Sequence, residues 1–201
     1  MKKRMLTIAA TAMATMMMAS PVMAQDFKIG ICNYVDDASL NQIVDNIQSR
    51  LKEIGEDKDV TFDVSYDNCN ADANVMEQII SDFQTDNVDL MVGVATPVAM
   101  RMQSATEGTD TPVVFIAVSA PVAAGVINDM DHPDKNATGT SNAIPVSDIF
   151  ALNNQLTPDC KTFGFLYCTS EVNSVNTIEA AKEYCDANGL SYKEATVTDS
   201  S

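Results

Sequence analysis

Basic residues are scarce in this sequence. The 201 residues include 12 lysines and arginines against 28 aspartates and glutamates, so the formal net charge is −16 at pH 7. Phosphate backbones and anionic lipid headgroups repel a chain with this balance of charge. Nucleic acids and membrane surfaces are therefore not expected as partners.

The common catalytic and nucleotide-binding motifs are also missing. There is no G-x-G-x-x-G, no P-loop, no G-x-S-x-G elbow and no C-x-x-C pair. The single histidine, His132, lies beside Pro133 in the acidic segment Asp129–Asp134. Because that segment lacks a spacing that would focus its side chains on one point, we interpret it as a solvated loop. No cofactor, metal ion or catalytic residue is predicted.

Residues 1–24 have the pattern of a secretory signal peptide. A basic start at residues 2–4 precedes the apolar run Met5–Ala19, which is too short to span a membrane. We expect cleavage after Ala24 and a soluble exported protein, which in a cell with two membranes is periplasmic. No cysteine follows the run closely enough to carry a lipid, so no membrane anchor is expected. An uncleaved anchor is the alternative.

Hydrophobic patterning then alternates between strands and helices. The stretch 90–95 is almost continuously apolar, which is typical of a central parallel strand covered by helices on both faces. Val60–Tyr66 alternates apolar and polar residues, which predicts a half-exposed strand near the sheet edge. The sequence predicts an α/β fold with a doubly wound parallel sheet. Its five strands, with helices between them, are expected near 27–32, 60–66, 88–95, 112–118 and 137–142.

Two sequence signals predict where helices begin and end. Thr96 is expected to cap the helix after the central strand, with Pro97 at the first helical position. Gly55 is expected to end the first helix. The central strand should therefore present a helix N-terminus at the sheet edge, where open α/β sheets bind anionic ligands.

The alternation restarts after residue 142. A helix near 147–156, a strand at 162–168, a loop at 169–174, a further helix and a strand at 191–197 predict a second, Rossmann-like unit. We divide the chain into an N-terminal lobe, residues 25–142, and a hinge crossover with the start of a second lobe, residues 143–201. The second lobe is interpreted as incomplete and the chain as truncated.

All five cysteines follow the predicted signal peptide, and in an exported protein some of them can pair. Cys32 and Cys69 each follow a predicted strand, and neighbouring parallel strands would place them at the same edge. Cys160 precedes a strand, and Cys185 lies near the end of the antiparallel helix that follows it. We predict the pairs Cys32–Cys69 and Cys160–Cys185, with Cys168 free. Five buried thiols are the alternative.

Polar residues follow several predicted strands and should meet at one sheet edge. Each of them alone is most often a simple cap or turn residue. Together they predict a cleft between two lobes, in which helix N-termini bind a carboxylate and hydroxyl and amide groups orient the ligand. These residues are Asn33, Tyr34, Thr96, Ser119, Asn173 and Ser174.

Several motifs, in this order and spacing, resemble the ABC-transporter substrate-binding proteins of the tryptophan/tyrosine-type family. The resemblance covers essentially the whole chain after the predicted signal peptide. It implies a type I periplasmic-binding-protein fold, with two Rossmann-like lobes that close on an aromatic or other apolar amino acid. The motifs are Ile29-Gly30-Ile31, Tyr34-Val35, Ala95-Thr96-Pro97, Phe115-Ile116-Ala117-Val118-Ser119, Ala137-Thr138-Gly139 and Ser170-Glu171-Val172-Asn173-Ser174.

The resemblance also implies which residues hold the ligand. It places Thr96, Glu171, Asn173 and Ser174 at the site. Ala120 departs from the family, which usually has an aspartate there, and this puts an ordinary amino-acid ligand in doubt. The length is a second departure, since the family continues for roughly another lobe. The full predicted ligand-binding set is Asn33, Tyr34, Thr96, Pro97, Ser119, Glu171, Asn173 and Ser174.

The sequence thus favours a binding protein that performs no chemistry. It would capture a small carboxylate-bearing metabolite, such as an apolar or aromatic amino acid, and deliver it to the membrane permease of an ABC importer, as a monomer. An exported sensory module that reports to a receptor is one alternative. An exported α/β enzyme that uses Ser119 or Ser174 is another.

Overall fold

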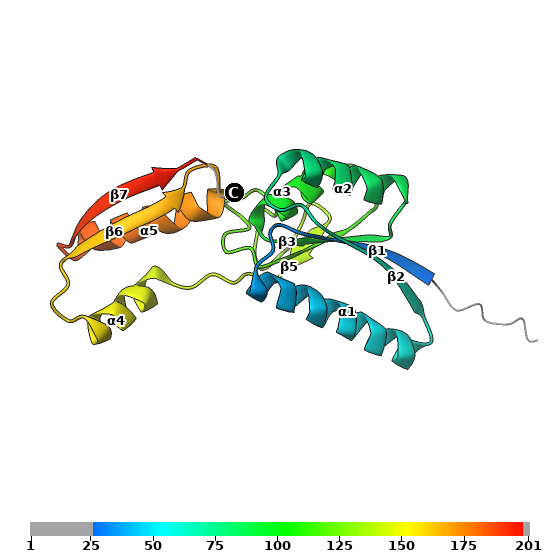
Figure 1. Ribbon diagram of the computed structural model, residues 1–201, viewed down its shortest axis with the longest axis horizontal. Coiled ribbons are helices and arrows are strands. Elements are labelled where there is room, and N and C mark those ends of the chain that lie inside the picture. Colours follow the sequence, from blue (N-terminus) through cyan, green and yellow to red (C-terminus); the bar gives the residue numbers. More distant parts are fainter. Residues whose placement is uncertain (1–25, 199–201) are drawn as a thin grey trace, which may run out of the picture.

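The computed structural model describes residues 26–198 and contains two parallel sheets (Figure 1). The first has five strands in the order β2-β1-β3-β4-β5, and the second pairs β6 with β7. The predicted α/β class and parallel sheet are confirmed. The elements are β1 (Asp26–Asn33), α1 (Ala38–Lys58), β2 (Thr61–Asn68), α2 (Ala73–Thr85), β3 (Leu90–Val94), α3 (Thr96–Ala105), β4 (Val113–Ile116), β5 (Ala137–Gly139), α4 (Val146–Leu156), β6 (Thr162–Cys168), α5 (Val172–Ala187) and β7 (Ser191–Val197).

Helices cover both faces of the five-stranded sheet, because its inner strands are apolar on both sides. On β3, Val92 and Val94 pack in the cluster that includes residues of α1, whereas Met91 packs in the cluster formed with α2 and α3. Strand side chains alternate between faces, so consecutive apolar residues supply both layers. The prediction that β3 is central and β2 lies at the edge is confirmed.

A close approach between β3 and α3 depends on Gly93. A Cβ atom at this position would lie 3.1 Å from the backbone N and Cα of Ala99. The missing side chain lets the first turn of α3 rest directly on the sheet. This contact fixes the start of α3 at the carboxyl end of the central strand.

The first helix does not end at Gly55 as predicted. It continues to Lys58, and Asp59 then adopts the left-handed conformation with φ 55°. The Val60 N–H donates to the Gly55 carbonyl across 3.1 Å, which closes the last turn. The left-handed residue that ends a helix is usually glycine, but aspartate also tolerates this conformation, and here it takes that position.

The segment between the fourth and fifth strands contains no helix. Residues 117–136 form turns. The Ala124 N–H donates to the Ala120 carbonyl across 2.8 Å, and the Val126 N–H donates to the Pro121 carbonyl across 2.9 Å. Val126 and Ile127 are nevertheless buried. This segment therefore packs on the core through the side chains of Val126 and Ile127 without forming a helix.

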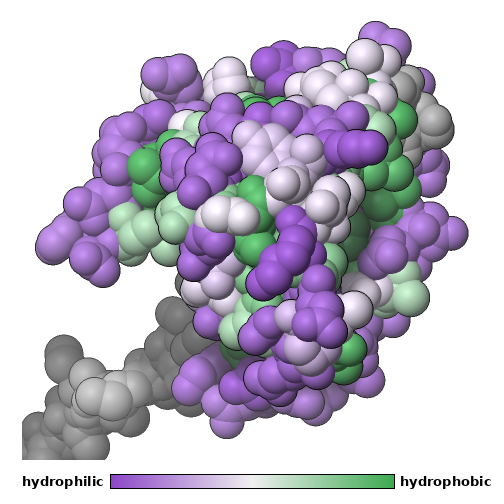
Figure 2. Space-filling model, turned by 90° about the vertical axis from the view of Figure 1, so that its left-hand side faces the viewer, coloured by the Kyte–Doolittle hydropathy of each residue, from purple (hydrophilic) through white to green (hydrophobic). Residues whose placement is uncertain are grey.

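The second unit is a helix-covered pair of strands, and it matches the predicted order of elements. The Phe150 ring lies 4.8 Å from the Phe163 ring and 4.4 Å from the Tyr184 ring, between centroids. The opposite side of the strands is open, since Leu166 of β6 is 72% exposed. Leu156, at the end of α4, is 76% exposed. Figure 2 views the molecule from this end and shows hydrophobic patches among hydrophilic ones.

Helix α5 begins earlier than predicted. Its first residue is Val172, and the Val175 N–H donates to the Glu171 carbonyl across 3.1 Å. Asn173 and Ser174 therefore lie in the first helical turn and not in a loop. Their polar side chains suggested a loop, but the carboxylate of Glu171 provides the Ser174 hydroxyl with a local partner that is compatible with a helix.

Within residues 26–198, no helix is long and apolar enough to cross a membrane. The predicted signal peptide, residues 1–24, lies outside this described range.

Candidate functional site

The turn between β3 and α3 presents helix donors at the carboxyl end of the central strand. Ala95 has φ 80° and ψ 159°, and it precedes the helix without offering a side-chain cap. Thr96 is the first residue of α3, so the predicted capping role is wrong and Pro97 takes the second position. Because Pro97 has no N–H and the Ala99 N–H already bonds to Ala95, the first-turn donors are the N–H groups of Thr96 and Val98.

The start of α5 supplies a second group of polar atoms. Glu171 stands directly before the helix, and its carboxylate accepts a hydrogen bond from the Ser174 hydroxyl across 3.2 Å. The Asn173 Oδ1 atom is buried and has no hydrogen-bond partner among the described residues. A buried acceptor without a partner is costly, so this atom is suited to a donor from a ligand.

These two helix starts meet at a cavity of about 390 Å³. Thr96 and Pro97 come from the first sheet's side and Glu171 from the second. Val172 also packs against the core of the first lobe, which holds the two units together at this point. Apolar residues form much of the wall. The lining residues are Met76, Thr96, Pro97, Met100, Arg101, Ser104, Ser170, Glu171 and Val172.

The cavity is lined by one basic residue, Arg101, and one acidic residue, Glu171. Arg101 forms an ion pair with Glu77 of α2, and its Nη2 atom donates to the Glu77 carboxylate across 2.7 Å. Glu171 is the acidic residue among those that line the cavity. The cavity thus combines the N-terminal end of α3, which carries the positive end of the helix dipole, with the carboxylate of Glu171.

Asn33 and Tyr34 lie close to this region but do not line the cavity. Asn33 is fully buried at the end of β1, where its amide donates to Asn41 across 3.1 Å, and its Oδ1 atom has no partner within the described part of the chain. Tyr34 packs against the same core cluster as Met76 and Met100. The structure thus places Tyr34 on the same face of the sheet as the core formed with α2 and α3.

Ser119 stands apart from the cavity lining. Its backbone carbonyl accepts a hydrogen bond from the Ser141 hydroxyl across 3.2 Å. This contact links the end of β4 to the segment that leads into the second unit. Of the predicted set, the cavity brings together Thr96, Pro97 and Glu171, with Asn173 and Ser174 in the adjoining turn of α5.

Sequence reasoning missed the apolar wall of the cavity. Met76 belongs to the apolar stripe of α2, and Met100 lies one turn into α3. A methionine at helical spacing is most simply assigned to the core. Only the packing of α2 beside α3 shows that these two side chains remain partly open at the cavity.

A larger cavity of about 460 Å³ lies at the opposite edge of the sheet. Asp89 and Met91 at the beginning of β3 line it, together with Thr106 beyond the end of α3. No helix N-terminus is found among its lining residues. We therefore assign the candidate site to the smaller cavity, where the strands end and the helices begin.

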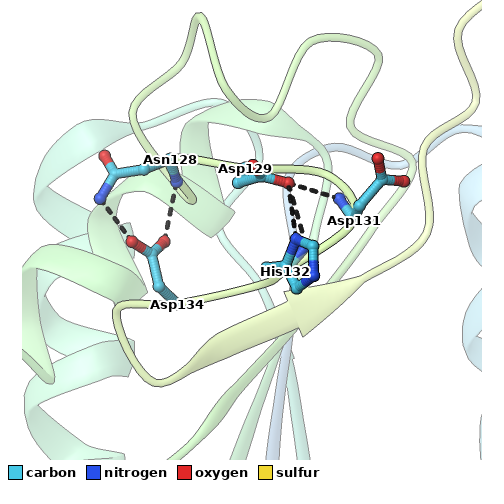
Figure 3. A network of polar contacts seen from close by, with 5 residues as sticks. All are labelled: Asn128, Asp129, Asp131, His132 and Asp134. Carbon is cyan, nitrogen blue, oxygen red and sulfur yellow. Dashed lines mark hydrogen bonds and ion pairs between the residues drawn. The ribbon is translucent and has the colours of Figure 1, made fainter.

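The acidic loop around His132 is solvated, in agreement with its interpretation from the sequence (Figure 3). The Asp129 carboxylate accepts from the backbone N–H groups of Asp131 and His132, while Asn128 donates to Asp134 through its backbone and side chain. These bonds from Asn128 lower the pKa of Asp134. No cluster of metal-ligating side chains occurs in residues 26–198. The carboxylates here hold the loop's own backbone.

All five cysteines are thiols in the structure, so neither predicted disulfide is formed in it. Cys32 and Cys69 are both fully buried and lie in one cluster, as their positions after neighbouring strands predicted. Cys160 is half-buried, and its thiol donates to the Thr162 carbonyl across 3.5 Å. Cys185 is buried in the small core of the second unit.

Comparisons with known proteins show which family the chain belongs to. The family model described as ABC transporter substrate binding protein matches residues 28–201. A curated relative from Clostridioides difficile, the tyrosine-binding protein, is 30% identical over 173 residues, which is 86% of this chain and 50% of the relative. The chain spans about half the length of the curated relatives it matches.

Solved structures agree with this assignment. An ABC domain from Streptococcus pneumoniae, determined in complex with L-Trp, is 34% identical with a TM-score of 0.79, and the match covers 87% of this chain and 58% of that chain. A ligand-free, open substrate-binding protein from Clostridium difficile is 34% identical with a TM-score of 0.66, covering 86% of this chain and 58% of that one. The predicted family and type I periplasmic-binding-protein fold are confirmed.

Proposed function

Because the chain belongs to the ABC transporter substrate-binding protein family, we propose that it is the extracytoplasmic solute-binding component of an ABC importer. Its ligand is a small carboxylate-bearing metabolite, and an apolar or aromatic amino acid fits best. One observation carries this proposal: the cavity of about 390 Å³ joins the start of α3 to the start of α5 and combines helix donors, one carboxylate and two thioethers.

Each part of the ligand has a complementary group. The N–H groups of Thr96 and Val98 and the positive end of the α3 dipole favour the ligand's carboxylate. Glu171 accepts from the ammonium group, and Asn173 provides a further acceptor beside it. Met76 and Met100 pack against the ligand's apolar side chain, because thioethers adapt to aromatic rings.

The relatives support this choice of ligand. The curated relative from Clostridioides difficile is a tyrosine-binding protein, and the Streptococcus pneumoniae structure holds L-Trp. In this chain Ala120 stands where the family usually has an aspartate, so Glu171 becomes the principal acceptor for an ammonium group in our proposal.

Binding works by closure of two lobes and involves no chemistry. The ligand first contacts α3 in one lobe, and contacts to α5 that exist only in the closed form then favour closure. The protein is exported through residues 1–24, acts as a monomer outside the cytoplasmic membrane, and releases its ligand to a permease. The lobe boundary near residue 142 provides the hinge.

Isothermal titration calorimetry with a panel of ligands tests the proposal. The panel contains tyrosine, tryptophan and leucine, with 4-hydroxyphenylacetate as an aromatic acid that lacks an ammonium group. We expect saturable binding of at least one aromatic or apolar amino acid and weaker binding of the acid. The absence of binding by every amino acid and every acid in the panel would refute it.

A further inference from the structure

Two buried cysteines lie side by side where the first two strands end. Cys32 is in β1 and Cys69 directly follows β2, and both are 0% exposed. In the parallel register Cys32 pairs with Asp67. Cys69 is two residues further along and so projects to the same face of the sheet. Both cysteines belong to the same buried core cluster.

Backbone contacts fix the two chain segments around this pair. The Cys69 N–H donates to the Asn33 carbonyl across 3.0 Å, and the Ala71 N–H donates to the Tyr34 carbonyl across 2.7 Å. The Cys69 thiol lies 3.2 Å from the same Tyr34 carbonyl. Cys69 is therefore held against Asn33, the last residue of β1, and against Tyr34, which follows it.

The two thiols differ in acidity. Interaction with Cys32 lowers the pKa of Cys69. Interaction with Cys69, together with burial, raises the pKa of Cys32. In the folded protein Cys69 is therefore the more acidic of the two thiols.

We propose that Cys32 and Cys69 form a disulfide that ties the end of β1 to the end of β2 in the exported protein. The exposure to an oxidising compartment rests on the proposed function. The pairing rests on the register of β1 and β2, on the backbone bond from Cys69 to Asn33 and on the shared buried cluster. The oxidant is a disulfide donor, either an oxidised dithiol protein or a small-molecule disulfide such as oxidised glutathione. It reacts while the segment is open during folding.

The reaction is an ordinary thiol–disulfide exchange. The Cys69 thiolate attacks one sulfur of the donor, which forms a mixed disulfide and releases the donor's other sulfur as a thiolate. Cys32 loses its proton to solvent and attacks the Cys69 sulfur, and the remaining donor sulfur leaves as a thiolate. The two cysteines lose two protons and two electrons, and the donor's disulfide is reduced to two thiols.

Oxidation changes the surroundings of Tyr34 in a defined way. The Tyr34 carbonyl loses the Cys69 S–H as a donor but keeps the Ala71 N–H. The covalent bond replaces a weak S–H contact between the two loops, so the Asn33-Tyr34 segment has less freedom to open. It also restricts the unfolded chain between the two cysteines, which stabilises the folded state.

A peptide map of the full chain tests the pairing directly. The reduced protein is unfolded in denaturant, refolded in a mixture of oxidised and reduced glutathione, denatured again, alkylated with N-ethylmaleimide and digested without reductant. We expect a linked peptide pair that contains Cys32 and Cys69. Alkylation of both cysteines after refolding with excess oxidised glutathione, or linkage of either to Cys160, Cys168 or Cys185, would overturn the proposal.

Thermal unfolding provides the second measurement. For the wild type, reductant should lower Tm by roughly 5–15 °C. The C32A/C69A variant should show no such dependence, and the C160S variant should keep it. An unchanged wild-type Tm on reduction would also refute the disulfide. Because neither measurement uses a ligand, failure of ligand binding would contradict the proposed function and leave these results standing.

Discussion

Thr96 and Glu171 line the same cavity although they follow strands of different sheets. Thr96 begins the helix that leaves the central strand, and Glu171 stands before the helix that follows β6. The arrangement places a helix N-terminus opposite a carboxylate, so one side of the cavity favours negative charge and the other positive charge. This polarity is the basis of the zwitterionic ligand proposed above.

Glu171 should determine the affinity for the ammonium group. We expect Glu171→Gln to weaken binding of the amino-acid ligand by about 10- to 100-fold, because a charge-assisted hydrogen bond contributes roughly 1.5–3 kcal/mol. Calorimetry measures the change. Glu179→Gln, on the exposed side of the same helix, is the matched control and should bind normally. Equal loss in both variants would argue for a general charge effect.

Met100 should contribute to recognition of the ligand's side chain. Met100→Ala removes apolar surface from the cavity, and we expect about 5- to 30-fold weaker binding of an aromatic amino acid, given roughly 0.8 kcal/mol for each buried methylene. The affinity for free alanine as a ligand should fall much less, since the methyl side chain of this amino acid does not reach the cavity wall. Met130→Ala changes an exposed loop residue and serves as the control. Unaltered affinity in Met100→Ala would exclude this side chain from the site.

Gly93 should be required for the contact between β3 and α3. An added Cβ would press on the backbone of Ala99, which cannot move without displacing α3. We expect Gly93→Ala to lower the free energy of unfolding by about 1–3 kcal/mol, as measured by urea denaturation. At Gly164 a Cβ would meet nothing within 4 Å, so Gly164→Ala is the control and should leave stability unchanged or slightly higher. Similar free energies of unfolding in the two variants would contradict this requirement, because β3 and α3 would then accommodate the added methyl group.

Glu194 should titrate below its ordinary range in the folded protein. Hydrogen bonds from Tyr167, across 3.0 Å, and from Lys182, across 3.2 Å, lower the pKa of Glu194. A lowered folded pKa stabilises the fold above the unfolded pKa, and this contribution disappears as the pH falls through the folded value. Carbon-detected NMR titration should show the pKa of Glu194 rising in Tyr167→Phe and unchanged in the distant Tyr66→Phe. A constant value in Tyr167→Phe would contradict the assigned cause.

Much of the fold could be predicted because the decisive signals are local. The continuous apolar run of β3 and the alternation in β2 each determine how many faces of a strand are covered. The helix ends were harder to predict. Asp59 in the left-handed conformation ended α1 after Gly55, and a local bond between Ser174 and Glu171 allowed α5 to begin before two loop-like residues.

The candidate site was predictable only in part, for a physical reason. Strand ends identify Thr96 and Pro97 by topology alone, and the motif resemblance identified Glu171. The apolar wall arises where α2 and α3 pack side by side, and a sequence pattern cannot distinguish a core methionine from one at the rim of a cavity. Ser119, in contrast, follows a strand but uses its carbonyl to hold Ser141.

The backbone of Ala95 has a consequence for the thermodynamics of recognition. Its φ of 80° and ψ of 159° lie in a region that residues other than glycine rarely adopt, at a cost of about 1–3 kcal/mol. The fold maintains this conformation before any ligand arrives, so the donors of α3 are already aligned. In the proposed mechanism, little entropy is then lost when the ligand meets the first lobe, and the ordering that accompanies capture is concentrated in the closing motion. Heat and entropy of binding should therefore report mainly on closure.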